Sequence, residues 1–471
     1  MSGISSGARR GLRLLAASVV LLTPSLVTVP SAAAQQPPKV NPKQLNLNPP
    51  DRAPDPTEQK LVCGKPFASS AATLRDPSDA QQLLEIDQLH SFATGAGQRV
   101  AVIDTGVKPS SRFGRVLPGG DLVSSSNGLD DCDGHGTIVA GIIAAKARPN
   151  SDGFVGVAPG ATLISIRQTS LSFAAKNSAR NESPAPIADT SYGNVLTLAW
   201  AVVKAVKAGA DVINISEVAC APAGTAMGDG QLGAALRYAH SRNVVVVAAA
   251  GNLEGNCKQQ NPYPTFANPD TAGWDNLQTI VSPAWYDDYV LTVGGVDSKE
   301  GQPAPFSVHG PWVDVAGPAT DIVSVGTDGS AVNRQQGKDG PISIDGTSFS
   351  TPYVAGLAAL IKQRYPGISA DDVVKRIIGT AHGPGAVRDP AVGYGVVDPL
   401  AALTTPMSAI TTPAERNTAV SMPRPAPVRD GYETTRKVAL AGAGGSLAVA
   451  LAYWLLTMPR RRLRALTEDD Y

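Results

Sequence analysis

The chain has 471 residues, of which 43% are apolar and 17% are charged. This composition supports a large folded domain with a sizeable core and excludes a chain that is disordered throughout. The 40 Lys and Arg residues balance 40 Asp and Glu residues. A formal net charge of zero gives no signal for an anionic partner, so we expect no nucleic-acid binding.

Residues 1–34 have the pattern of a secretory signal peptide. Three arginines, ending with Arg13, precede an apolar run over residues 14–22, and small residues follow up to Ala34. A positive start, a short apolar middle and a small-residue end predict export, with cleavage after Ala34. The run is short and is followed by Pro24, which disfavours a mitochondrial-type presequence or an N-terminal membrane helix.

An extension over residues 35–79 follows the signal peptide. Its first part, to about Pro56, is rich in Pro, Asn and Gln and has little apolar periodicity. Such a segment is expected to be an extended or wrapping arm. From residue 80 to residue 403, by contrast, apolar strands alternate with helical patterns, and we expect one large domain there.

The alternating region predicts the fold class. Strands are expected at 99–103, 162–166, 211–215 and 244–249, and helices at 136–146, 195–208, 231–241, 350–364 and 370–380. Strands this apolar must be covered on both faces. We therefore predict an α/β fold in three layers, a mainly parallel sheet between helices. Stretches 170–194 and 253–278, rich in Ser, Ala and Asn, are expected to be surface insertions.

The C-terminal part predicts a membrane anchor. Residues 404–437 form a Pro-rich linker, and residues 438–458 carry no charge. A helix of that length rises about 30 Å, enough to cross a bilayer, and its Pro-rich flank argues against a buried core helix. Four arginines lie between Arg460 and Arg464. Because Lys and Arg prefer the cytoplasmic side, we expect residues 459–471 inside and the rest outside.

Four polar residues lie at predicted strand ends or helix starts, where parallel α/β sheets place their active sites. Asp104 follows the first strand, His135 precedes the first helix, Asn252 follows the fourth strand, and Ser348 precedes the helix from 350. Taken singly, each has a commoner interpretation, as a turn residue, a solvated loop histidine or a helix N-cap. Together they supply a nucleophile, a base, an orienting carboxylate and an oxyanion donor.

This combination predicts a serine-protease mechanism. His135 would take the proton of Ser348, and Asp104 would hold the imidazole. The side-chain amide of Asn252 and the backbone N–H of Ser348, at a helix N-terminus, would stabilise the oxyanion. The chain order Asp, His, Ser matches one of the three known orders of this triad.

The segments around these residues resemble the signatures of the subtilisin (subtilase) family. They are Val102-Ile103-Asp104-Thr105-Gly106, His135-Gly136-Thr137, Gly251-Asn252 and Gly346-Thr347-Ser348. The resemblance covers residues 80–403 and implies a subtilisin-like fold and serine endopeptidase activity, with these residues in the family's roles. The order of signal peptide, arm, peptidase domain, linker and span resembles the mycosins, proteases of type VII secretion. It implies an enzyme outside the cytoplasm that cleaves exported proteins and contacts membrane proteins of a secretion complex.

The substrate groove is expected to involve Ser216, Glu217, Val218 and Gly251. Glu217 and Val218 stand where the family usually has a small, Gly-containing segment, and their bulk and charge predict narrow specificity. The acidic stretch 130–133 could suggest the calcium that many subtilases bind. No loop has a full set of ligands at the required spacing, so we expect no metal and no cofactor.

Four cysteines in an exported chain favour two disulfides, and a zinc site would need a close Cys pair that the sequence lacks. Cys220 and Cys257 follow strands that one helix joins, so both are expected at the same sheet edge, within bridging range. This choice leaves Cys63 with Cys132, which would pin the arm to the loop of His135. The mycosin resemblance implies the same pairing.

Two hypotheses for the function follow. The first is an active, selective endopeptidase, and the second is a structural or docking component of a secretion complex in which proteolysis is secondary. The complete set of four catalytic groups favours activity, because a pure scaffold would not require all of them.

Overall fold

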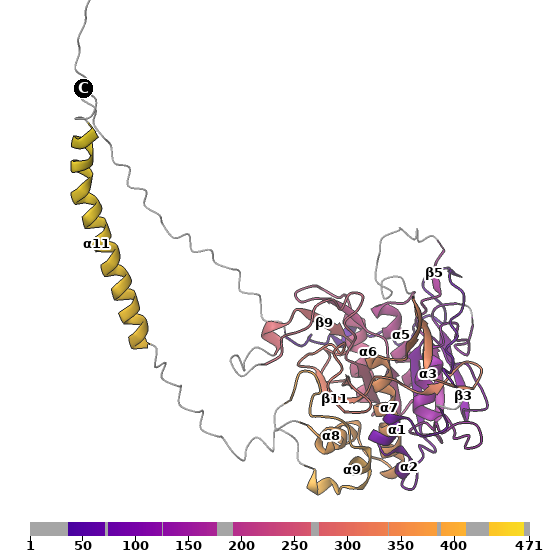
Figure 1. The fold of residues 1–471 in the computed structure, drawn as a ribbon. Helices are drawn as coiled ribbons and strands as arrows, with labels where there is room; N and C mark the ends of the chain where they lie inside the picture. The colour runs from indigo at the N-terminus through magenta and orange to yellow at the C-terminus, as the bar shows by residue number, and fades with distance from the viewer. Residues whose placement is uncertain are drawn as a thin grey trace, which may run out of the picture. The chain divides into compact units, whose positions relative to one another are not determined.

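The structure is a computed structural model that describes residues 36–70, 74–124, 126–176, 192–264, 273–337, 339–383, 388–410 and 433–465. The predicted signal peptide lies outside the described residues, as do most of the predicted linker, the last six residues and parts of both predicted insertions. The chain divides into two compact units, residues 1–416 and 417–471 (Figure 1).

A seven-stranded parallel sheet forms the centre of the first unit, in the order β11-β10-β8-β6-β2-β4-β3. The strands are β2 (Arg99–Asp104), β3 (Arg115–Asp121), β4 (Thr162–Arg167), β6 (Val212–Ile215), β8 (Val245–Ala249), β10 (Leu291–Val296) and β11 (Val313–Pro318). The predicted fold class is confirmed. Sequence reasoning located β2, β4, β6 and β8, but not the two strands at one edge or β3 at the other.

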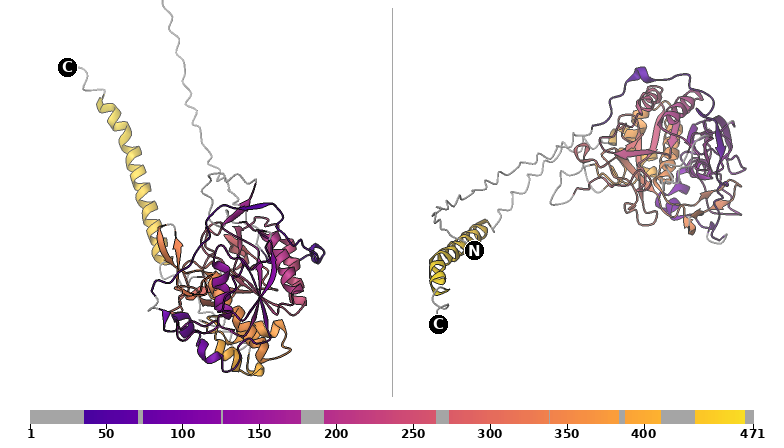
Figure 2. Two further views of the ribbon diagram at one scale, coloured as in Figure 1. Left: turned by 90° about the vertical axis from the view of Figure 1, so that its right-hand side faces the viewer. Right: turned by 90° about the horizontal axis from the view of Figure 1, so that it is seen from above.

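Helices cover both faces of this sheet, so that it is the middle of three layers (Figures 1 and 2). In β2, Val100 and Val102 belong to one core, with α3 and α7, while Ala101 and Ile103 belong to the other, with α5 and α6. The helices of the unit are α1 (Asp79–Leu83), α2 (Ile86–Leu89), α3 (His135–Ala144), α5 (Val195–Lys207), α6 (Gly230–Ser241), α7 (Thr347–Arg364), α8 (Ala370–Thr380) and α9 (Pro399–Thr404).

Short strands and 3₁₀ helices lie outside the central sheet and its helices. The two-stranded antiparallel pairs are β1 (Thr57–Gln59) with β5 (Phe173–Ala175), β7 (Ala219–Pro222) with β9 (Thr279–Ser282), β12 (Ser324–Val325) with β13 (Ala331–Val332), and β14 (Arg334–Gly337) with β15 (Gly340–Ser343). The 3₁₀ helices are Pro42–Gln44, Trp274–Asn276 and Met407–Ala409. The pair β7–β9 matters for function, because β7 begins directly after the predicted groove segment.

The N-terminal arm crosses the surface of the domain. Lys204 on α5 pairs with Asp51 of the arm, and Lys207 donates to Asn48 at 3.1 Å. The arm then adds β1 to β5 and reaches a disulfide between Cys63 and Cys132. Both disulfides of the structure, this one and Cys220–Cys257, have the pairing expected from the strand order, because β6 and β8 are neighbours in the sheet.

In the second unit, the structure describes one helix, α11 (Glu433–Ala465). Among the described residues, its segment Lys437–Thr457 is the one helix long and apolar enough to cross a membrane, and none of that segment is buried. The predicted span over residues 438–458 coincides with it to within one residue. It is therefore a candidate membrane anchor.

Candidate active site

Asp104 and His135 form a tight pair at the carboxyl end of β2. Asp104 is fully buried, and its Oδ1 accepts hydrogen bonds from the backbone N–H of Thr105 and from His135 Nδ1, both at 2.7 Å. His135 is the first residue of α3. Gly136 permits this approach, because a Cβ there would lie 2.1 Å from the carbonyl oxygen of Gly106 and 3.0 Å from Asp104 Oδ1.

A second buried carboxylate fixes the turn that carries His135. Asp131 accepts hydrogen bonds from Gly134 N–H at 2.7 Å, from the N–H and hydroxyl of Thr137 at 2.8 and 2.6 Å, and from the hydroxyl of Thr105 at 2.9 Å. Burial raises the pKa of the Asp131 carboxyl, although these donors oppose the shift. Asp131 therefore holds the start of α3 beside Asp104.

The acidic stretch that suggested calcium is engaged by donors of the protein itself. Asp131 binds the turn as described, Asp133 accepts from the hydroxyls of Ser170 and Ser172, and Asp130 lies 3.2 Å from Lys108 Nζ. These contacts give the three carboxylates a structural role in which each has donors from the chain.

Ser348 lies in the first turn of α7. The helix begins at Thr347, three residues earlier than predicted, and its N-cap is Gly346 rather than a serine. Gly346 has φ of +147°, and a Cβ there would lie 3.2 Å from Asn252 Nδ2, which explains why a residue with a larger side chain does not stand at this N-cap.

The Ser348 hydroxyl donates to the carbonyl oxygen of Ser216 at 2.9 Å, and the Ser216 hydroxyl donates to the Ser348 carbonyl at 2.7 Å. The ring of Phe349, the next residue of α7, lies 5.1 Å from the His135 ring, centroid to centroid. The start of α7 therefore packs against the imidazole. Among the described residues, the Ser348 hydroxyl is bonded to Ser216 and not to His135.

The orientation of the Asn252 amide is determined by its neighbours. Its Oδ1 accepts from the backbone N–H of Thr347 at 2.9 Å and from the Thr347 hydroxyl at 3.0 Å. The amide nitrogen therefore points away from Thr347, and it donates a long hydrogen bond of 3.3 Å to Glu254 Oε1. This places an N–H donor, rather than an acceptor, beside the N-terminus of α7.

The predicted groove residues lie between these groups. Gly251 N–H donates to the Thr347 hydroxyl at 3.2 Å, and a methyl group of Val218 lies 3.5 Å from where a Gly251 Cβ would be. Glu217 extends to the imidazole, with its Oε1 3.7 Å from His135 Nδ1 and its side chain 35% exposed. The structure thus brings every predicted groove residue to the edge of the sheet that carries Asp104.

The charges of this site are coupled. Burial lowers the pKa of His135, but the Asp104 carboxylate outweighs it through charge and hydrogen bonding, and with Glu217 and Asp131 it raises the pKa above the usual imidazole value. Burial raises the pKa of Glu217 to about 7, against the attraction of His135. The imidazole therefore lies in a field that favours its protonated form.

Asp104, His135 and Glu217 are also the group of described residues whose ligand atoms lie close enough together, within 4.8 Å, to hold a metal. The hydrogen bond from His135 Nδ1 to Asp104 uses the atoms that an ion between the three side chains would need. The geometry fits an oriented imidazole better than a metal centre.

Comparison with known proteins agrees with this geometry. The subtilase family profile matches residues 95–395. Mycosin-1 of Mycobacterium tuberculosis is 46% identical over 91% of this chain and 95% of its own length. The solved structure of MycP1, described as a serine protease and an essential component of the type VII (ESX-1) secretion system, is 46% identical with a TM-score of 0.71, and covers 78% of this chain and 99% of that one.

The chain belongs to the mycosins, a group within the subtilase family. The predicted enzyme class, a subtilisin-like serine endopeptidase, is confirmed by this membership. A mycosin-like chain in the structure of an intact ESX-5 inner membrane complex is also similar, with 36% identity, a TM-score of 0.72 and coverage of 90% of this chain and 99% of that one.

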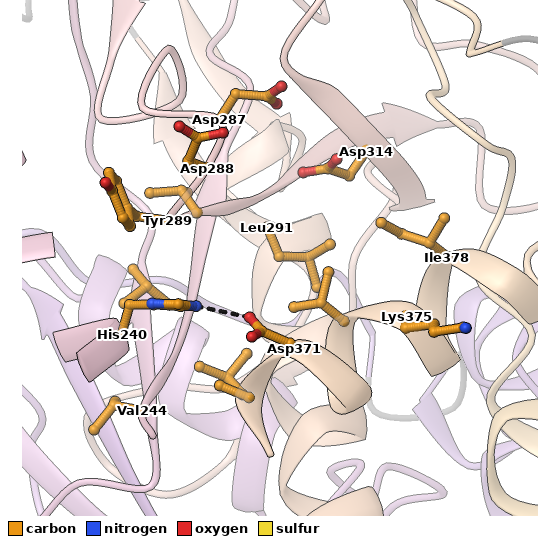
Figure 3. Close-up of a pocket in the computed structure, with 15 residues that line it drawn as sticks. His240, Val244, Asp287, Asp288, Tyr289, Leu291, Asp314, Asp371, Lys375 and Ile378 are labelled. Atoms are coloured by element: carbon orange, nitrogen blue, oxygen red, sulfur yellow. Dashed lines mark hydrogen bonds and ion pairs between the residues drawn. The ribbon is translucent and has the colours of Figure 1, made fainter. Parts of the chain in front are cut away.

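A cavity of about 310 Å³ lies at the amino ends of the strands, opposite the catalytic residues. It is enclosed by α6, α8 and the starts of β8 and β10 (Figure 3). Its lining includes the apolar residues Val244, Leu291 and Ile378 and four carboxylates, those of Asp287, Asp288, Asp314 and Asp371. His240 Nε2 lies 2.7 Å from Asp371 across the cavity.

Sequence reasoning missed two residues that position the subtilase site, Asp131 and Thr347. Asp131 lies four residues before His135, which could have indicated a role in the same turn. Its place in the acidic stretch 130–133 instead suggested a calcium ligand. Thr347 gave no signal beyond its place before Ser348, because its role depends on Asn252, 95 residues away in the chain.

Proposed function

We propose that the chain is a membrane-anchored endopeptidase in which Ser348 is the nucleophile, His135 the general base and Asp104 the group that orients it. Asn252 Nδ2 and the Ser348 backbone N–H stabilise the oxyanion. The observation that carries the proposal is the 2.7 Å hydrogen bond between His135 Nδ1 and buried Asp104, beside a helix start that carries Ser348.

The steps follow from these positions. Because Asp104 accepts the Nδ1 proton, the other ring nitrogen of His135 is free to take the proton of Ser348 as its oxygen attacks the scissile carbonyl. The oxyanion displaces the long contact between Asn252 and Glu254 and accepts from the amide nitrogen. His135 then gives the proton to the leaving amine, and water releases the acyl group by the same route in reverse.

The location follows from the two ends of the chain. The predicted signal peptide and the C-terminal span support a catalytic unit outside the cytoplasm and a short tail inside. The candidate span Lys437–Thr457 supports the anchor. The orientation would be contradicted if a tag at Tyr471 were cleaved by protease added to intact cells.

The alternative function, a docking component of a secretion complex, is favoured by one observation, the similarity to a chain of the ESX-5 inner membrane complex. We infer that this chain likewise contacts membrane proteins of a type VII secretion system and acts on proteins exported there, with the narrow specificity that Glu217 and Val218 favour.

Both functions are tested by comparing exported proteins from three strains that carry the wild-type chain, the Ser348→Ala chain or no chain. We expect new N-termini in the wild type that are absent from the other two. Export that continues with Ser348→Ala but stops without the chain would support docking as well as proteolysis. Identical cleavage in the wild type and Ser348→Ala would contradict the endopeptidase proposal.

A further inference from the structure

We propose that Glu217 binds a lysine or arginine side chain of the substrate, at the second residue on the acyl side of the scissile bond (P2). The inference rests on the proposed endopeptidase function and adds a substrate class to it, namely proteins cut one residue beyond a basic residue.

The backbone that carries Glu217 is fixed on both sides. On one side, the hydroxyl of Ser216 accepts from Asn214 Nδ2 at 2.9 Å and donates to the Ser348 carbonyl. On the other side, β7 begins at Ala219 and pairs with β9, and Cys220 is bonded to Cys257. The backbone from which the Glu217 side chain projects is therefore held in place beside the nucleophile before the substrate arrives.

The Glu217 side chain is partly exposed, and among the described residues no hydrogen bond to its carboxylate is found. Its side chain is 35% exposed, and among the interactions found in the described part of the chain its one ionic partner is His135, at 3.7 Å. A carboxylate can accept several hydrogen bonds, and one that is half-buried loses solvation unless donors replace the water. A cationic side chain of the substrate would supply those donors.

Orienting the imidazole is not a sufficient explanation for Glu217. Its oxygen lies 3.7 Å from His135 Nδ1, beyond hydrogen-bond distance, and the Nδ1 proton is directed to Asp104 at 2.7 Å. Asp104 and Asp131 already fix the ring and its turn. Glu217 adds negative charge rather than a geometric constraint.

Neighbouring carboxylates make the electrostatic potential around Glu217 more negative. Besides burial, the negative charges of Asp104, Asp133 and Glu254 raise the pKa of Glu217. Asp133 accepts from two serine hydroxyls, and Glu254 accepts from Asn252. Of the four carboxylates, Glu217 is the one without a hydrogen-bond donor among the described residues. A cation that enters the groove would supply hydrogen-bond donors to Glu217 and favour its ionised form.

The position along the substrate follows from the two edges of the imidazole. The edge opposite Nδ1 faces the scissile bond in the proposed mechanism, so the residue bonded to Ser348 occupies that side. Glu217 lies at the Nδ1 edge. A side chain that reaches it must run along the ring, away from Ser348, which the preceding residue of the substrate can do. The long stem of Lys or Arg can pack along this path while its charged end reaches the carboxylate.

Binding of this cation has a catalytic consequence. Glu217 raises the pKa of His135, and a substrate ammonium or guanidinium beside Glu217 reduces that effect. More of the imidazole is then in the unprotonated form that accepts the Ser348 proton. A basic residue at P2 should therefore raise kcat as well as lower KM.

The test uses the full chain in detergent and coumarin-amide tetrapeptides in which P2 is lysine, arginine, norleucine, glutamine or glutamate and the other positions are mixtures. We expect kcat/KM for lysine or arginine to exceed that for norleucine about tenfold, which is about 1.4 kcal/mol. In Glu217→Gln the ratio should fall below about threefold, and Glu217→Asp should restore part of it. Glu217→Lys should reverse it in favour of glutamate.

Glu254→Gln is the matched control, because it removes a carboxylate from the same groove without touching His135, and it should keep most of the preference. A wild-type ratio near one, or a ratio that survives in Glu217→Gln, would overturn the inference while hydrolysis that depends on Ser348 upholds the proposed function. If no peptide is hydrolysed, the proposed function fails, and binding of the lysine and norleucine peptides to Ser348→Ala protein decides the inference. Equal affinities would refute it.

Discussion

The carboxyl ends and the amino ends of the parallel strands form two opposite edges of the central sheet, the carboxyl edge and the amino edge. Carboxylates lie at both, but their partners differ. At the amino edge, Asp371 pairs with His240 at 2.7 Å, and Arg388 holds Asp287 and Asp314, each at 2.7 Å. At the carboxyl edge, Asp104 and Glu217 share one imidazole, and Glu217 has no hydrogen bond among the described residues. The carboxylates of Asp371, Asp287 and Asp314 thus each have a hydrogen-bonded partner, whereas Glu217 is left able to bind one.

The helix ends explain part of this difference. His240 lies in the last turn of α6 and Asp371 in the first turn of α8, so the Asp371 carboxylate is at the helix end that stabilises a negative charge. At the carboxyl edge, α3 begins at His135, beside Asp104, and α7 begins one residue before Ser348. Two helix N-termini there favour a negative charge that develops during the reaction, as on an oxyanion.

Removing one polar group at each edge tests most strongly whether only the carboxyl edge is needed for catalysis. Ser348→Ala or His135→Ala should lower kcat by about 10⁴–10⁶-fold, because each removes a member of a unit that acts together. Asp371→Ala at the amino edge should change kcat less than about threefold. Peptide hydrolysis by purified variants measures both, and a large loss of kcat in Asp371→Ala would contradict the division of roles.

The disulfide between Cys63 and Cys132 ties the arm to the catalytic edge and closes a loop with a sequence separation of 69. Replacing both cysteines by serine should cost about 4 kcal/mol of unfolding free energy. Hydrogen exchange should become faster around His135 and stay unchanged in α8. Equal acceleration at both edges would show that the arm stabilises the whole domain rather than the loop.

Removing the oxyanion donor should have a smaller effect than removing the nucleophile. Asn252→Ala should lower kcat by about 10²–10³-fold with little change in KM, because the amide acts on charge that develops in the transition state. Steady-state kinetics on the same peptides give both constants. A rise in KM alone would instead assign Asn252 to substrate binding.

At the amino edge, Arg388→Ala should lower stability by about 2–3 kcal/mol while leaving kcat within about twofold. The substitution leaves Asp287 and Asp314 without the guanidinium that both of these half-buried carboxylates share. Denaturant unfolding measures the first effect and peptide hydrolysis the second. A loss of activity in protein that is still folded would show that the two edges are coupled.

The smallest expected effect is a shift in the pH dependence of kcat/KM. In the proposed mechanism the unprotonated form of His135 is the active one. Asp104 and Glu217 raise the pKa of His135, so kcat/KM should rise with pH into the region above the ordinary imidazole value. Glu217→Gln removes one carboxylate and should move this limb to lower pH by less than about one unit. A shift to higher pH, or none, would contradict the electrostatic coupling.

Sequence reasoning located the strands that are continuous apolar runs, β2, β4, β6 and β8. It missed β3, β10 and β11, because Gly294 and Gly295 interrupt β10, Pro118 lies in β3 and Asp314 lies in β11. These residues are poor in strands by propensity, and the sheet tolerates them through tertiary packing. In β10, for instance, a Cβ at Gly294 would lie 2.4 Å from the carbonyl oxygen of Ala391.

The candidate site was partly accessible from sequence because its residues follow strand ends or begin helices, positions that local patterns reveal. The supporting contacts were not accessible. The bond from Thr347 to Asn252 and the approach of Glu217 to His135 join residues about 80 or more positions apart in the chain. Only the register of the parallel strands determines which of these side chains meet.

The most direct test of the central claim is covalent labelling of the full chain with a fluorophosphonate, followed by identification of the modified peptide. The claim is that the carboxyl edge, and not the amino edge, is a working catalytic site. It predicts a single modified residue, Ser348, with labelling lost in His135→Ala and retained in His240→Ala. Labelling at another residue, or labelling of Ser348 that persists in His135→Ala, would contradict it.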